Sequence, residues 1–82
     1  MPYVYRADIL EALAAHGMRP LAETPPEVVR EAISDLYRYE IRRLRSALLA
    51  GRVAKREYAD HVVALRRRYW VLSVPVDLWL ER

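Results

Sequence analysis

A single glycine between two long amphipathic segments limits this chain to a small set of helical folds. Residues 25–50 have apolar side chains at helical spacing, Gly51 interrupts them, and residues 54–72 resume the same spacing. Val53 and Tyr58 are spaced as a hydrophobic staple, which fixes how a chain enters a helix. Because the connection is short, the two predicted helices are neighbours that run in opposite directions. The sequence therefore predicts a long antiparallel helical hairpin.

A shorter helix is predicted before the hairpin, over residues 6–16. Its apolar residues share one face, and Gly17 follows it as a left-handed C-cap. The start of the second helix is indicated by Thr24-Pro25-Pro26-Glu27. In this segment we expect Thr24 to be the N-cap and Pro25 to occupy the first helical position.

Both ends of the chain differ from the helices. In residues 73–82 apolar residues alternate with other side chains, which is typical of extended backbone, and Tyr3-Val4-Tyr5 fits the same conformation. At 82 residues the chain is expected to form one domain, residues 1–82. The predicted fold class is all-α, with a short N-terminal helix packed on a long antiparallel hairpin and extended N- and C-terminal arms.

The third predicted helix has a second, weaker apolar stripe that a closed hairpin does not cover. Ala59, Val63 and Trp70 lie on this stripe. The first helix is only about three turns long, so it covers part of the hairpin and leaves apolar surface for the arms or another chain. We expect a homodimer through this surface; cover by the first helix and the tail alone is the alternative. Trp79 is either a plug over the first helix or an accessory anchor on a partner.

Glu40 falls in the middle of the apolar stripe of the second helix. An unpaired buried carboxylate is costly, so this group should be paired, protonated or close to water. The antiparallel register places it near Leu65. We expect an ion pair with Arg43, His61 or Arg68; a catalytic carboxylate and a polar group that sets register are the alternatives.

The net charge of +3 conceals a strong asymmetry along the chain. Residues 1–37 have three Arg against six acids, residues 38–68 have ten basic groups against three acids, and residues 69–82 have a net charge of −1. This basic block fits a surface that neutralises nucleic-acid phosphates. It also fits a solvated surface whose charges complement the helix dipole. The candidate nucleic-acid contacts are Arg38, Arg42, Arg45, Arg52 and Arg56.

Composition argues against most catalytic chemistry. No Cys is present, which removes disulfides and thiolate metal sites, and two glycines cannot form a glycine-rich phosphate loop. His16 and His61 lie on different predicted helices, so we expect no metal, no cofactor and no enzymatic activity. The absence of Asn, Gln and Cys fits a heat-adapted source, and GC-rich codon usage fits the same bias.

Location and function follow from these patterns only as expectations. No apolar run reaches the roughly 18 residues of a membrane span, and the first residues lack the regions of a secretory signal. We expect a cytoplasmic protein without a membrane partner. The predicted function is a non-enzymatic protein–protein interaction module that self-associates through its hairpin. The alternative is a nucleic-acid-binding accessory protein that uses the basic hairpin face.

Overall fold

The computed structural model describes residues 2–82, and these residues are mostly helical. Within them the only β-type pairing is an isolated antiparallel bridge between Tyr5 and Leu80, so the all-α prediction is confirmed. The elements in chain order are the helices α1 (Ala7–Ala14), α2 (Pro26–Leu49) and α3 (Lys55–Arg68), followed by the 3₁₀-helices η1 (Trp70–Ser73) and η2 (Val76–Trp79).

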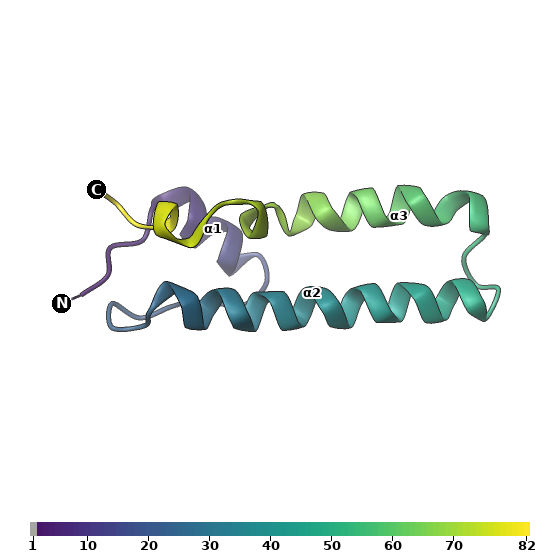
Figure 1. Ribbon diagram of the computed structural model, residues 1–82, viewed down its shortest axis with the longest axis horizontal. Coiled ribbons are helices and arrows are strands. Elements are labelled where there is room, and N and C mark those ends of the chain that lie inside the picture. Colours follow the sequence, from purple (N-terminus) through teal and green to yellow (C-terminus); the bar gives the residue numbers. More distant parts are fainter. Residues whose placement is uncertain (1) are drawn as a thin grey trace.

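The molecule is a rod of 50 × 17 × 16 Å. Figure 1 shows α2 as the longest helix of the rod. The helix α3 lies beside one half of α2 and runs in the opposite direction. Gly51 lies at the turn between them with φ +75°, in the left-handed region that glycine adopts without steric cost. The helix α1 and the C-terminal 3₁₀-helices lie beside the other half of α2 (Figure 1).

The predicted start of α2 is wrong by one residue. Pro25 is extended, with ψ 138°, and Pro26 is the first helical residue. The ring of a proline disfavours the α conformation for the residue before it, so Pro26 keeps Pro25 out of the helix. Thr24 is therefore not the N-cap; its Oγ1 accepts a hydrogen bond from the Leu21 N–H at 3.0 Å and closes the preceding turn.

The helix α3 also ends earlier than predicted, at Arg68 rather than Leu72. Tyr69 leaves the α conformation with φ −107° and ψ 31°, and the chain continues as η1. This break places Tyr69 and Val71 in the core, at 2% and 0% exposure. The last predicted turn of the α-helix is therefore a 3₁₀-helix, and this change of geometry accompanies the burial of the two side chains.

The tail is not the extended arm that its alternation predicts. It forms η2, in which Val76 and Trp79 stand three residues apart, the period of a 3₁₀-helix. Trp79 is completely buried, and its indole N–H donates to the Val74 carbonyl at 3.1 Å, whereas Leu78 on the predicted apolar face is exposed. The tail therefore folds back as part of the core.

The hydrophobic core is confined to one end of the rod. Between Ser34 and Ala64 no residue is buried, although Leu44, Leu48 and Val62 are partly covered. The half of the α2–α3 pair near Gly51 is therefore two helices thick, with no third element over it. The buried apolar residues that make up the core are Tyr5, Ile9, Leu13, Val29, Ile33, Leu65, Tyr69, Val71 and Trp79.

Candidate functional site

Two surfaces of the α2–α3 pair have the properties of binding sites. The first, here called the apolar groove, has a volume of about 550 Å³ and runs along α3 onto η1. Val63 and Trp70 line it together and remain 45% and 41% exposed, so they form an apolar patch rather than single exposed side chains. The residues that line the groove are Tyr37, Val63, Arg66, Arg67, Tyr69, Trp70, Leu72 and Ser73.

Among the residues predicted for an interface, Val63 and Trp70 lie together in this groove. Ala59 is exposed one helical turn before Val63, but it does not line the groove. The assignment of Trp79 as an interface anchor is wrong, because its side chain is fully buried in the core. The tail closes around this indole through the Val74 carbonyl, so Trp79 is an internal plug.

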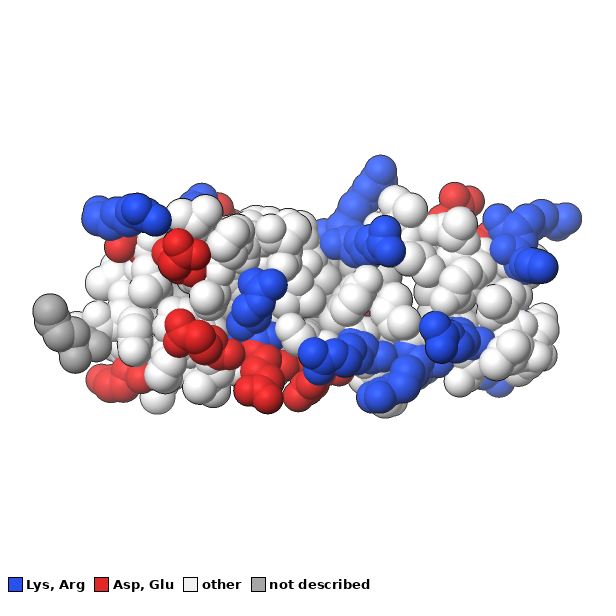
Figure 2. Space-filling model, in the orientation of Figure 1, with Lys and Arg blue, Asp and Glu red and all other residues white. Residues whose placement is uncertain are grey.

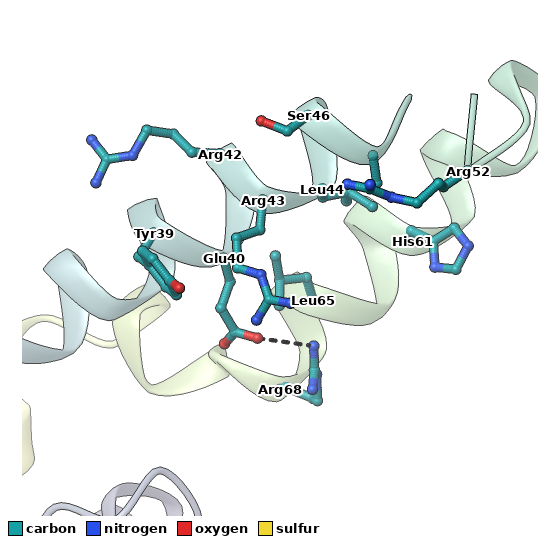
Figure 3. Close-up of a pocket in the computed structure, with 11 residues that line it drawn as sticks. Tyr39, Glu40, Arg42, Arg43, Leu44, Ser46, Arg52, His61, Leu65 and Arg68 are labelled. Carbon is teal, nitrogen blue, oxygen red and sulfur yellow. Dashed lines mark ion pairs between the residues drawn. The ribbon is translucent and has the colours of Figure 1, made fainter. Parts of the chain in front are cut away.

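The second surface, here called the basic cleft, lies between α2 and α3 and includes the loop that joins them (Figure 3). It has a volume of about 570 Å³ and an excess of positive side chains over its single carboxylate, Glu40. The residues that line it are Tyr39, Glu40, Arg42, Arg43, Leu44, Ser46, Ala47, Arg52, His61, Leu65 and Arg68.

The groove and the cleft lie on opposite sides of α3. His61 and Arg68, seven residues apart, line the cleft, whereas Val63 and Trp70, also seven apart, line the groove. An offset of two residues rotates a side chain by about 200° around a helix axis. A partner that occupies one surface therefore leaves the other open.

Glu40 is paired, in agreement with the expectation from the sequence. Its carboxylate lies 3.6 Å from the Arg68 guanidinium, and the Tyr69 hydroxyl donates a hydrogen bond to it. The Glu40 side chain is 31% exposed, so water and these two partners share the solvation of its charge. Arg68 was among the predicted partners; Tyr69 was not.

Tyr69 links α1, α2 and α3 at this point. Its ring stacks on His16 at a centroid distance of 4.0 Å and meets Tyr37 edge-on at 5.2 Å. The His16 Nε2–H donates to the Arg68 carbonyl at 2.6 Å, which ties the end of α1 to the end of α3. Burial raises the pKa of Tyr69 above its ordinary value, and the hydrogen bond to Glu40 and its negative charge add to this increase.

The five arginines predicted as nucleic-acid contacts do not all line the cleft, although Arg38, Arg42 and Arg45 lie at same-side spacing on α2. Arg42 and Arg52 line the basic cleft. Arg38 pairs with Asp35 on its own helix at 2.6 Å, and Arg45 and Arg56 are exposed outside the cleft. Figure 2 shows most acidic groups toward the end of the rod that holds the termini, where basic groups also lie, and most basic groups from its middle to the hairpin turn.

Arg43, His61 and Arg68 were expected from the sequence as possible partners of Glu40, and all three line the cleft with it; that Arg52 joins them from the loop was not predicted. For Arg43 a further signal was available, because Tyr39, Arg43 and Ala47 repeat at four-residue spacing and so share one side of α2. Within residues 2–82 His61 forms no ion pair, with Glu40 or with any other acid. The tertiary arrangement turns His61 toward the cleft instead.

Over residues 2–82 the structure contains no group of three His, Asp or Glu side chains arranged for a metal ion. In the same span, every helix is too short or too polar to cross a lipid bilayer. Comparisons of the chain with protein-family models, with curated proteins and with solved structures gave no match.

Proposed function

We propose that this chain is a non-enzymatic protein–protein interaction module, and that it self-associates through the apolar groove and the adjoining flank of its antiparallel hairpin. The observation that supports this proposal most directly is the incomplete core. The half of α2 and α3 near Gly51 has apolar side chains at helical spacing and none that is buried. A second copy of the chain would supply the missing layer, as in a bundle of four helices.

The exposed area is the right size for such an interface. A compact monomer of 9.6 kDa is expected to expose about 5,100 Å², whereas this chain exposes 6038 Å². The excess of about 900 Å² is close to the roughly 800 Å² that each partner contributes to a stable protein interface. The rod shape that exposes this area also raises the radius of gyration, which is 15.0 Å against about 12 Å for a compact chain of this length.

The charge distribution favours a second copy over an unrelated partner. Residues 1–37 have a net charge of −3 and residues 38–68 a net charge of +7, and these segments lie toward opposite ends of the rod (Figure 2). Two copies side by side and reversed place the acidic end of each against the basic half of the other. This arrangement is the isologous contact of a two-fold dimer, and its opposite potentials steer association.

The test is the mass of the protein in solution. At tens of micromolar, analytical ultracentrifugation should give a dimer of about 19 kDa, twice the chain mass of 9.6 kDa. Val63→Glu places a charge in the groove and should give a monomer. Val28→Glu is the matched control, because Val28 is an exposed valine on a helix away from the groove, and it should leave the dimer intact.

Circular dichroism must show that both variants stay helical, which we expect because both valines are about half exposed. A wild-type protein that stays monomeric at this concentration overturns the proposal. So does a dimer that persists in Val63→Glu, because the contact would then lie elsewhere.

A further inference from the structure

The basic cleft contains positive charge that the chain itself does not neutralise. Within residues 2–82, Arg42, Arg43 and Arg52 have no carboxylate at ion-pair distance. The one acid of the cleft, Glu40, is already engaged by Arg68 and by the Tyr69 hydroxyl. An anion entering the cleft therefore meets guanidinium groups without a counter-ion, and Arg68, which pairs with Glu40 at 3.6 Å.

The guanidinium groups come from three separate segments and surround one space. Figure 3 shows Arg43 reaching from α2 across the gap toward α3, and Arg52 extending back from the connecting loop. Arg68 approaches from α3, while Arg42 points away from the other three (Figure 3). Arg43 and Arg68 thus lie near Glu40 and Arg52 lies beside Leu44 (Figure 3), and these are the guanidinium groups that a ligand in the cleft can contact.

The geometry points to a site for a small phosphorylated molecule of nucleotide size, which the basic cleft binds by its phosphate groups. Guanidinium forks match phosphate oxygens bidentately, and such charge-assisted bonds are stronger than neutral ones. The cleft volume of about 570 Å³ exceeds what a single phosphate fills and lies in the range of small-molecule sites. Leu44, Ala47 and Leu65 form an apolar wall for the rest of the ligand.

A concave site favours a small ligand over a nucleic-acid strand. A surface that follows a phosphate backbone needs a row of free cations. On the side of α2 that holds Arg42 and Arg45, Arg38 is already paired with Asp35. Of the cations without an ion pair in residues 2–82, Arg42, Arg43 and Arg52 line the cleft, whereas others, Arg45 and Arg56 among them, are exposed outside it. The cleft is a different surface from the apolar groove, because the residues of α3 that line the two lie on opposite sides of that helix.

The test measures binding of four probes to the wild-type protein by isothermal titration calorimetry at low salt. Pyrophosphate supplies phosphate alone, ADP supplies phosphate with a ring system, adenosine supplies the ring alone, and single-stranded oligothymidylate supplies a polyanion. We expect pyrophosphate and ADP to bind, with ADP the tighter of the two, and adenosine not to bind.

Two double variants separate the cleft from general electrostatics. Arg43→Gln/Arg52→Gln removes two charges inside the cleft and should weaken ADP binding at least about tenfold, because charge-assisted hydrogen bonds to phosphate are lost at both positions. Arg45→Gln/Arg56→Gln removes two exposed charges outside the cleft and should change ADP affinity by less than about twofold, because only long-range screened attraction is lost.

Three outcomes overturn the inference: no binding of pyrophosphate or ADP at millimolar concentration, equal weakening in both double variants, or oligothymidylate binding that is tighter than ADP and equally reduced in both. The last two would assign binding to the diffuse basic surface.

Discussion

Replacing Tyr69 with phenylalanine tests the contact that joins the three α-helices. Phenylalanine retains the ring that stacks on His16 and meets Tyr37, and it removes only the hydroxyl that donates to Glu40. The Glu40 carboxylate then keeps Arg68 as its one protein partner at 3.6 Å. The variant thus isolates a single hydrogen bond to a charged acceptor in a chain that otherwise keeps its packing.

The expected loss of stability is about 1–2 kcal/mol. A hydrogen bond to a charged group contributes roughly 1.5–3 kcal/mol, and the lower part of this range applies because the Glu40 side chain is 31% exposed and water replaces part of the bond. A chain of this length has a total free energy of unfolding of roughly 4–12 kcal/mol. Tyr69→Phe should therefore still fold, with a Tm lower by roughly 4–16 °C.

Urea and thermal unfolding followed by circular dichroism measure this change. Tyr39→Phe is the matched control, because Tyr39 is 52% exposed and its hydroxyl has no hydrogen-bond partner within residues 2–82; its stability should change by less than about 0.5 kcal/mol. A double-mutant cycle with Glu40→Gln should return a coupling of similar size. Equal stability of Tyr69→Phe and the wild type, or equal losses in the two tyrosine variants, would refute the reasoning.

Tyr69→Phe should also change how the free energy of unfolding depends on pH in alkaline solution. Burial, the hydrogen bond to Glu40 and its charge raise the folded-state pKa of Tyr69 above its ordinary value of 10.0, whereas Arg68 opposes the increase. The folded state therefore keeps a proton that the unfolded state loses, and the free energy of unfolding decreases as pH rises above about 10. This decrease should be smaller in Tyr69→Phe. It should not vanish, because burial and the charge of Glu27 also raise the pKa of Tyr5; an unchanged pH profile would contradict the assignment.

Two further variants test the turn and the tail. Gly51→Ala should cost roughly 1–2 kcal/mol in denaturant unfolding, because φ +75° is strained for alanine although the added Cβ meets no atom within 4 Å; a stability equal to the wild type would show that the turn adapts. Arg30→Met should release the tail, since Arg30 donates to the carbonyls of Leu72 and Val74 at 2.9 Å each. Faster amide exchange should appear in residues 70–80 and little in α3, and an exchange pattern unchanged in the tail would argue against this tether.

Local sequence signals were most reliable where backbone geometry alone decides the outcome. Gly17 and Gly51 both adopt positive φ at the ends of helices, as the spacing of the apolar residues indicated. The error at Thr24 was also local: the restriction that Pro26 imposes on Pro25 is a property of two adjacent residues and outweighs the capping pattern.

The tail shows why alternation by itself is ambiguous. Residues 73–82 alternate as a strand would, but an extended segment needs a neighbouring strand to satisfy its backbone, and the chain offers only the bridge from Tyr5 to Leu80. The 3₁₀ turns of η1 and η2 satisfy backbone groups locally and bury Val71 and Trp79. Which aromatic side chain enters the core was thus decided by contacts with α1 and α2.

Some features of the candidate sites could be predicted from the sequence, and others depend on the tertiary structure. The surplus of apolar residues at Val63 and Trp70 and the excess of arginine after residue 37 are properties of the sequence, because periodicity and composition give the side of a helix and its charge. The cleft that joins Arg43, Arg52 and Arg68, and the hydrogen bond from Tyr69 to Glu40, exist only in the folded chain. Their formation depends on the register and rotation of α2 against α3, and packing at the far end of the rod fixes both.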